Sequence, residues 1–144
     1  MNICMYTHRG QFKGTDKVEI VPGFFQGASW GEGSVFFEEE VFFYFLPAIY
    51  KHVPWFDYYG ITVIERARWE RISDELRFLS CILRHAETEA ELLNEDRQIM
   101  NVPEASFLKT FSSSKERLAT VADELVAWAA VHLQSKGCVT VRGL

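Results

Sequence analysis

The fold is decided by residues 53–87, which read VPWFDYYGITVIERARWERISDELRFLSCILRHAE. Val53 and Pro54 predict the end of a preceding helix, because a residue before proline avoids the α region. Gly60 then gives the backbone the freedom to turn, and the β-branched run Ile61–Ile64 predicts a short strand. This stretch therefore predicts that an aromatic turn leads through a strand into a helix.

The helix predicted within this stretch begins at Glu65 or Arg66 and is amphipathic. Its apolar residues recur at three- and four-residue spacing, which places them on one helical face. They are Trp69, Ile72, Leu76, Leu79, Leu83 and Ala86. Most of the charged residues fall outside this stripe, so the pattern predicts that the helix packs on a core through one face.

A second long helix is predicted near the C-terminus. Its buried stripe is predicted to comprise Leu118, Val121, Ala122, Leu125, Trp128, Ala129 and Leu133. Val126 and Val131 widen the stripe, which predicts burial on more than one side of the helix. We interpret Ser112–Ser114 as a linker and cap, with Ser113 and Glu116 at capping-box spacing.

Shorter elements complete the second half of the chain. The pair Lys136-Gly137 predicts the end of the last helix. The run Cys138–Val141 predicts a terminal strand that pairs either with Ile61–Ile64 or with an N-terminal hairpin. Capping-box spacing in Thr88–Glu91 predicts a short acidic helix, and one or two further helical turns are predicted over Glu104–Phe111.

The N-terminal part predicts a β-hairpin followed by an irregular loop. Asn2–Thr7 alternates imperfectly, Lys17–Val21 alternates polar and apolar residues, and Pro22 ends that strand. The loop Phe24–Ser34 is rich in glycine. Within it, Gly31–Ser34 could be a phosphate-binding turn, but it lacks a complete glycine-rich motif. We favour a loop whose final serine caps a helix.

Val35–Tyr50 fits either a strand or a helix, and we predict a helix. Three consecutive glutamates, Glu38, Glu39 and Glu40, suit the first turn of a helix better than a strand. A kink or a second helical segment is expected at Pro47. The glutamates are interpreted as a solvated helix face, rather than as paired acid–base groups or metal ligands.

Composition is typical of one packed domain. The chain has 144 residues, of which 48% are hydrophobic and 15% aromatic, and single domains commonly have this length. Together with the predicted elements, these values predict a single α+β domain over residues 1–144, mainly helical and with a small antiparallel or mixed sheet.

Charge and cysteine content limit the location and the partners. A net charge of −5 disfavours nucleic acid, because phosphate contacts need clustered Lys and Arg. It suits a basic protein partner, although mild acidity also serves solubility alone. Three cysteines without paired spacing, and no recognisable signal peptide, predict reduced thiols in the cytoplasm. No apolar run reaches membrane-spanning length, so no membrane partner is predicted.

No motif for catalysis is present in the sequence. The four histidines are scattered, and neither GxSxG nor HExxH occurs, although an enzyme stays an open alternative. Cys81 and His85 lie one helical turn apart, which is half of a possible zinc site, but no further ligands are evident. We favour a packed cysteine and a helix-terminal histidine, and predict no catalytic residue, metal or cofactor.

One run resembles a known class of protein. Phe36–Leu79 reads FFEEEVFFYFLPAIYKHVPWFDYYGITVIERARWERISDELRFL, an aromatic-rich helix, a P-x-F-D-Y-Y-G-like turn, a short strand and then W-x-x-I-x-x-x-L. This pattern, and the closing helix with CVTVRGL, is similar to small bacterial immunity-type proteins of contact-dependent and polymorphic toxin systems. The resemblance covers about half of the chain. It implies a cytoplasmic protein that binds a toxin domain, and it implies no catalytic residues.

The resulting hypothesis is an immunity protein that binds and neutralises a cognate, basic, nuclease-type toxin domain. Its contacts would be acidic and tyrosine side chains, since exposed tyrosines anchor interfaces and carboxylates steer basic partners. The candidate residues are Glu38, Glu39, Glu40, Asp57, Tyr58, Tyr59, Glu87, Glu89, Glu91, Glu95 and Asp96. Trp55 and Phe56, in the same turn, are expected to pack beneath the following helix.

Two alternatives stay open. The first is a small enzyme or ligand-binding domain with a pocket near the aromatic turn 55–60, lined by His52, Asp57 and Tyr59. The second is a homodimer formed through the wide apolar stripe of the last helix.

Overall fold

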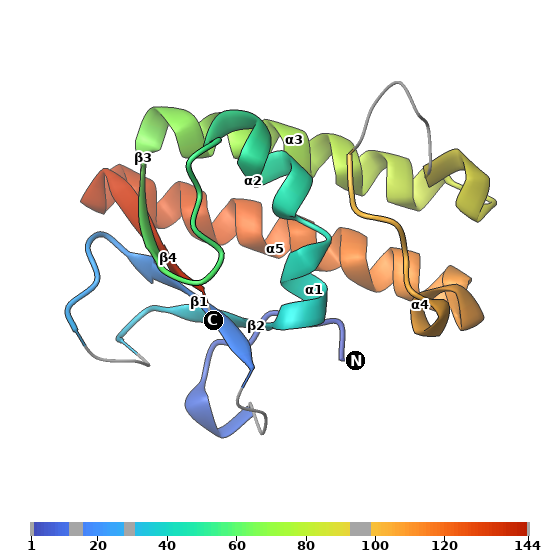
Figure 1. The fold of residues 1–144 in the computed structure, drawn as a ribbon, viewed down its shortest axis with the longest axis horizontal. Coiled ribbons are helices and arrows are strands. Elements are labelled where there is room, and N and C mark those ends of the chain that lie inside the picture. The colour runs from blue at the N-terminus through green and yellow to red at the C-terminus, as the bar shows by residue number, and fades with distance from the viewer. Residues whose placement is uncertain (1, 12–15, 28–30, 93–98, 144) are drawn as a thin grey trace.

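The computed structural model describes residues 2–11, 16–27, 31–92 and 99–143. Within these residues, five α-helices and a four-stranded antiparallel sheet form an α+β fold (Figure 1). The predicted fold class, mainly helical with a small antiparallel sheet, is confirmed. No helix in the described ranges has the length and the apolar character that crossing a bilayer requires.

The sheet has the order β2-β1-β4-β3, with every neighbouring pair antiparallel. Its strands are β1 (Lys17–Pro22), β2 (Val35–Glu38), β3 (Ile61–Glu65) and β4 (Cys138–Arg142). The C-terminal strand therefore lies between β1 and β3, and Ile61 faces Arg142 in the register. The predicted strands at Ile61–Ile64 and Cys138–Val141 are confirmed. The pairings predicted as alternatives for the terminal strand occur together, since β4 pairs with β3 on one side and with β1 on the other.

The predicted N-terminal hairpin is wrong. Asn2–Thr7 forms no strand and contributes one bridge, in which Tyr6 and Phe36 exchange backbone hydrogen bonds of 2.9 Å. The strand β1 pairs with β2 instead. Asn2–Thr7 therefore lies along the outer edge of β2, and β2 takes the predicted place of this segment beside β1.

Residues 35–50, predicted as a kinked helix, divide into three elements. They are β2, α1 (Glu39–Phe43) and α2 (Leu46–His52). The side chains of Val35, Phe36 and Phe37 are all buried. A strand directs successive side chains to opposite faces. Val35 and Phe37 point into the core, and the Lys17 ammonium lies 5.9 Å from the ring centre of Phe36. The predicted restart at Pro47 is confirmed, since it lies in the first turn of α2.

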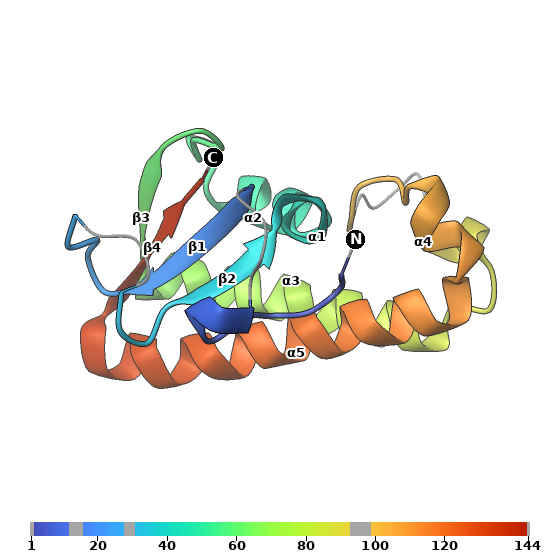
Figure 2. The ribbon, with the colours of Figure 1, turned by 90° about the horizontal axis from the view of Figure 1, so that it is seen from below.

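Two long helices cover one face of the sheet. They are α3 (Arg66–His85) and α5 (Phe111–Lys136), which lie side by side below the strands in Figure 2. Every residue of the predicted α3 stripe is buried, and the α5 stripe is buried except for the half-buried Trp128. Val131 is 65% exposed, so its assignment to the buried stripe is wrong. The stripe is used inside the domain and is not left over for a homodimer.

The start of α5 also differs from the prediction. Ser112–Ser114 belongs to the helix, and Ser114 is buried. The helix begins earlier because α4 (Ala105–Lys109) leads into it through Thr110 alone. The predicted end of α5 is confirmed: Gly137 has a φ of 78°, a left-handed conformation that favours glycine.

Two short 3₁₀ turns complete the described elements: Arg9–Gln11 and Glu89–Leu92. The second of these turns lies in the short acidic helix predicted after Thr88. Residues 93–98 of that prediction lie outside the described ranges, and Ile99 and Met100 are not helical. The predicted helical turns over Glu104–Phe111 are confirmed by α4.

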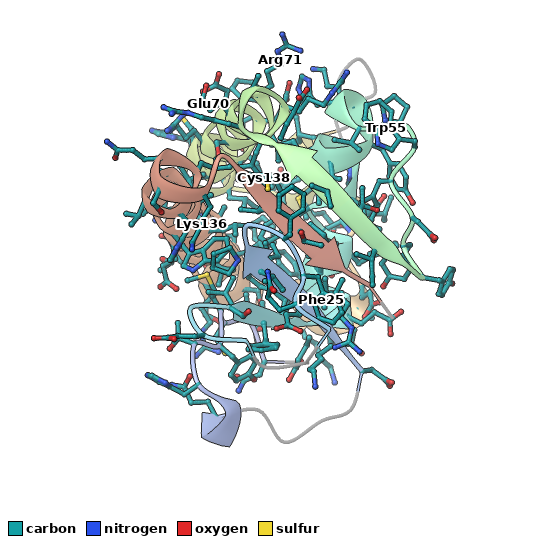
Figure 3. The ribbon with its side chains drawn as sticks, turned by 90° about the vertical axis from the view of Figure 1, so that its left-hand side faces the viewer. Phe25, Trp55, Glu70, Arg71, Lys136 and Cys138 are labelled. Carbon is teal, nitrogen blue, oxygen red and sulfur yellow. The ribbon has the colours of Figure 1, made fainter. Side chains whose placement is uncertain are left out.

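The loop that follows β1 covers the outer face of the sheet over β1 and β4, whereas Ile61 and Val63 of β3 are exposed. Gly23 donates its N–H to the Cys138 carbonyl at 2.9 Å and accepts the Thr140 hydroxyl at 2.7 Å. Under the same loop, the buried Glu19 lies 3.6 Å from Arg142, whose guanidinium stacks 5.0 Å from the Phe25 ring centre. Figure 3 shows Phe25 against the strands and Trp55 beyond β3.

An ion-pair cluster joins α2 to α3 at Glu75. The Lys51 ammonium lies 2.8 Å and His52 Nε2 3.2 Å from the same carboxylate oxygen. Burial alone would raise the pKa of Glu75, but the hydrogen bonds from Lys51 and His52 outweigh it, and the pKa is lowered. The carboxylate is therefore the favoured form in the folded state.

We expect Glu75 to make stability depend on acid pH. A lowered pKa in the folded state gives stability that is full above the unfolded pKa and is lost as the pH falls through the folded value. Because Lys51 is well exposed, the loss should be about 0.5 kcal/mol. Urea unfolding at neutral pH and below about pH 4 should show this loss in the wild type and not in Glu75→Gln. An identical pH dependence in both proteins would contradict the assignment.

Candidate functional site

The aromatic turn between α2 and β3 is held by its own polar groups. Asp57 donates its N–H to Thr62 Oγ1 at 3.1 Å, and its carboxylate accepts the Tyr59 N–H at 3.0 Å. Gly60 N–H closes the turn on the Asp57 carbonyl at 3.2 Å. A Cβ at Gly60 would lie 2.3 Å from the Asp57 carboxylate, so the turn requires glycine there.

The two apolar residues at the start of the turn have different environments. Phe56 is buried and packs edge-on against Tyr50, which confirms its structural role. Trp55 is 58% exposed, so its predicted burial beneath the helix is wrong. The Arg68 guanidinium lies 4.5 Å from the Trp55 ring centre. This cation–π contact lets the indole pack at the surface rather than in the core.

The two tyrosines of the turn point to different surroundings. Tyr58 is half-buried, and its hydroxyl donates to Glu39 Oε1 at 3.0 Å. Burial and this hydrogen bond raise the pKa of Tyr58, so the phenol stays protonated. Tyr59 is 75% exposed and packs edge-on against Tyr58 at 5.1 Å. One tyrosine therefore fixes the turn, and the other presents its ring to solvent.

The Tyr58–Glu39 contact brings the three glutamates next to the turn. Glu38 lies on β2, where its carboxylate accepts the Asn2 N–H at 2.8 Å and the Tyr6 hydroxyl at 3.4 Å. Glu39 is half-buried, and Glu40 is exposed. The interpretation as a solvated helix face is therefore wrong for Glu38 and Glu39. We call Glu38, Glu39, Glu40, Asp57, Tyr58 and Tyr59 the acidic–tyrosine patch.

The distribution of ion pairs distinguishes this patch from the helical face. Six carboxylates on or near α3 and α5 lie within 3.9 Å of a cationic side chain: Glu65, Glu70, Asp74, Glu75, Glu116 and Asp123. Within the described ranges, no ion pair involves a carboxylate of the acidic–tyrosine patch. Lys17 is the register partner of Glu38 on β1, so the negative charge available to attract cations from solution lies mainly on Glu39, Glu40 and Asp57.

The remaining acidic candidates lie elsewhere. Glu87, Glu89 and Glu91 follow the C-terminal end of α3, far from the aromatic turn in Figure 1. Glu91 is turned back on its own segment, where it accepts the Glu87 N–H at 2.8 Å. Glu95 and Asp96 lie outside the described residues. The structure thus brings together six of the predicted site residues and separates three from them.

The C-terminal tail positions the patch, which the sequence did not predict. Gly143 donates its N–H to the Gly60 carbonyl at 2.8 Å, which extends the β3–β4 ladder by one residue. A Cβ at Gly143 would lie 1.8 Å from the Tyr58 carbonyl oxygen. The only signal in the sequence was a glycine after a strand, and nothing in the pattern relates it to the tyrosines.

We expect Gly143→Ala to displace the aromatic turn. The methyl group collides with backbone rather than with a flexible side chain, so the tail and the turn must separate. Amide exchange of Tyr59 and Gly60 should accelerate by about tenfold or more, while amides in α5 keep wild-type protection. Gly10→Ala is the matched control, since nothing lies within 4 Å of its added Cβ. Unchanged exchange in the turn would contradict this role.

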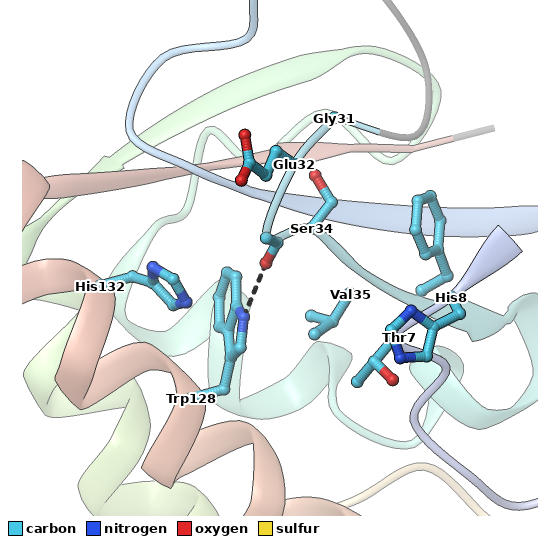
Figure 4. A pocket seen from close by; sticks show the side chains of 10 residues that line it. Thr7, His8, Gly31, Glu32, Ser34, Val35, Trp128 and His132 are labelled. Carbon is cyan, nitrogen blue, oxygen red and sulfur yellow. Dashed lines mark hydrogen bonds between the residues drawn. The ribbon is translucent and has the colours of Figure 1, made fainter.

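The three residues predicted to line a pocket at the aromatic turn have separate surroundings. His52 contacts Glu75, Asp57 bonds within its own turn, and Tyr59 faces solvent. A cavity of about 530 Å³ lies elsewhere, between the loop before β2, the N-terminal segment and α5 (Figure 4). Its wall includes Trp128, whose Nε1–H donates to the Gly33 carbonyl at 2.9 Å, and His132, whose ring lies 4.8 Å from the indole.

The glycine turn at this cavity does not begin a helix. Ser34 is buried, its N–H donates to the Gly31 carbonyl at 3.1 Å, and β2 follows directly. The predicted helix cap is therefore wrong, and a phosphate site at a helix N-terminus is not formed here.

Comparison with protein-family models, with curated proteins and with solved structures finds no significant match.

Proposed function

We propose that the chain is a protein-binding domain, and that its partner is a basic toxin domain that it neutralises as a cytoplasmic immunity protein. The observation that carries this proposal is the group of carboxylates around Tyr58 and Tyr59, none of which forms an ion pair within the described residues. The resemblance of Phe36–Leu79 to immunity-type proteins supplies the class of partner.

The patch combines two features that interfaces use. Exposed tyrosines give rigid, amphipathic contact area at low entropic cost. Carboxylates around them accelerate encounter with a basic partner and disfavour acidic ones. Glu38, Glu39 and Asp57 are already oriented by internal hydrogen bonds. Binding therefore costs little further conformational entropy of these side chains.

A nuclease-type toxin fits this surface. Nucleases hold phosphate backbones with clustered Lys and Arg, so their substrate surface is basic. An acidic patch that docks there excludes the nucleic acid by occupying the same side chains. Neutralisation then needs no chemistry from this chain.

The test is a rescue experiment in a bacterial host. The toxin domain encoded by the neighbouring reading frame is expressed alone, with this chain, or with the Glu39→Gln/Glu40→Gln/Asp57→Asn variant. We expect growth to be rescued by the wild type and not by the variant. A control variant, Glu70→Gln/Asp74→Asn, removes carboxylates that have ion pairs on α3 and should rescue fully. Killing with the wild type present, or a metabolic gene in that position, would overturn the proposal.

A second candidate is a small-molecule-binding domain that uses the cavity at Trp128. Its volume of about 530 Å³ lies within the range of ligand pockets. A thermal-shift screen of small aromatic and anionic compounds tests this function. The shift in melting temperature is compared between the wild type and His132→Ala. Stabilisation of the wild type alone would support this function, and equal shifts in both proteins would exclude the cavity as the site.

A further inference from the structure

Cys81 and His85 form an exposed pair on α3. Their Sγ and Nδ1 atoms lie 3.7 Å apart, and His85 Nδ1 also lies 2.8 Å from the Cys81 carbonyl oxygen. The favoured interpretation of a packed cysteine is wrong, because Cys81 is exposed, unlike the buried Cys138. A thiol and an imidazole therefore face solvent side by side on a rigid helix.

We propose that this pair is one half of a tetrahedral Zn²⁺ site, and that a second copy of this chain supplies the other half through the same two residues. Tetrahedral zinc with bonds of about 2.3 Å to sulfur and about 2.05 Å to nitrogen places those two atoms about 3.6 Å apart. The observed distance of 3.7 Å meets this requirement without any movement of α3.

Zinc binding changes the protons on both side chains. The Cys81 thiol loses its proton to solvent and binds as the thiolate, while His85 binds through the Nδ1 lone pair with its proton on Nε2. His85 then gives up its contact with the Cys81 carbonyl. That carbonyl stays in the backbone hydrogen-bond ladder of α3, so no backbone group is left unsatisfied.

We assign the remaining ligands to a second copy, because the described part of the chain supplies no further ligand to this pair. Among the described residues, no three His, Cys, Asp or Glu side chains are placed to hold a metal ion. Structural zinc sites take four protein ligands. We place two α3 helices antiparallel, with a two-fold axis at the height of Leu83, midway between Cys81 and His85. Each cysteine then lies opposite the histidine of the other copy, and the two-fold symmetry closes the assembly as a dimer.

The surroundings of the pair suit such a contact. Phe78, one turn before Cys81, is 38% exposed and offers apolar surface next to the metal. The antiparallel arrangement also brings Arg77 of one copy toward the segment that follows α3 in the other, where Glu87 and Glu89 lie. Opposite charges therefore meet at both ends of the contact.

Sedimentation velocity with added zinc chloride tests the site. We expect the wild type to be monomeric in EDTA and to become a dimer with half an equivalent of zinc per chain. Cys81→Ser and His85→Asn should each abolish the metal-dependent dimer. Cys4→Ser, at a half-buried cysteine, is the matched control and should dimerise like the wild type. Because both ligand side chains are exposed, their variants should unfold at the wild-type temperature in EDTA.

Cobalt provides a second readout of the ligand set. Co²⁺ should give the intense visible bands of a tetrahedral complex and a thiolate charge-transfer band, both absent from Cys81→Ser. Zinc bound without dimerisation, a dimer that survives both substitutions, or a weak octahedral cobalt spectrum would each overturn the proposal. The site is independent of the toxin partner, so these outcomes leave the proposed function untouched.

Discussion

Replacing Trp69 with alanine is expected to lower the free energy of unfolding by about 3–5 kcal/mol. Trp69 is fully buried on the inner face of α3, immediately after the junction with β3. Its removal leaves a cavity between the two long helices and the sheet, where the surrounding side chains relax only in part. Urea unfolding followed by circular dichroism measures the loss directly.

Two controls make this prediction specific. Trp55→Ala removes the same side chain from an exposed position and should cost less than about 1 kcal/mol. Trp69→Phe should cost less than the alanine variant, because the Trp69 indole N–H has no hydrogen-bond partner among the described residues. Equal losses for Trp69→Ala and Trp55→Ala would contradict the packing described above.

Replacing Tyr59 with alanine is expected to raise the dissociation constant for the basic partner by about 30-fold, or about 2 kcal/mol. The Tyr59 ring is 75% exposed in the free protein and would become the buried anchor of the complex. Titration calorimetry with the toxin domain from the rescue experiment gives the constant. The melting temperature should stay unchanged, since the ring contributes little to the folded state.

Val131→Ala is the control for this measurement. Val131 is also exposed and apolar, but it lies on α5, away from the acidic–tyrosine patch. Its dissociation constant should match that of the wild type. If Tyr59→Ala binds as tightly as Val131→Ala, the interface does not include the aromatic turn.

In the elements that were predicted correctly, the hydrophobic residues recur with the spacing of one type of secondary structure only. Both long helices bury a stripe with helical spacing, so Trp69 and Leu125 could be assigned to the core without any tertiary information. The strand at Ile61–Ile64 was equally clear, because β-branched residues follow Gly60. In such segments the local pattern and the tertiary environment favour the same structure.

Tertiary contacts decided the elements that were predicted wrongly. The aromatic run at Val35–Phe37 fits the spacing of either a helix or a strand. It forms a strand whose backbone pairs with β1 on one edge and with Tyr6 on the other. A single sequence contains no signal for these pairings. Trp55 is another such case. Its indole packs at the surface against the Arg68 guanidinium of α3, a contact that the sequence does not indicate.

The candidate site was recognised by residue type but not by arrangement. Acidic and tyrosine residues were singled out from Glu38 to Asp96, yet only the Tyr58–Glu39 hydrogen bond shows which of the described ones lie together. Gly143 is 83 positions from Gly60, its hydrogen-bond partner. Contacts at this separation follow from strand order, and the sequence left that order open.

Electrostatic steering by the acidic–tyrosine patch can be measured as the association rate of this chain with the purified toxin domain, by stopped flow over a range of salt concentrations. If the acidic–tyrosine patch steers a basic partner, the wild-type rate should fall by about tenfold or more between low salt and 0.5 M salt. Glu39→Gln/Glu40→Gln/Asp57→Asn should associate slowly at every salt concentration, and Glu70→Gln/Asp74→Asn should follow the wild type. A wild-type association rate that does not change with salt would contradict electrostatic steering by the acidic–tyrosine patch.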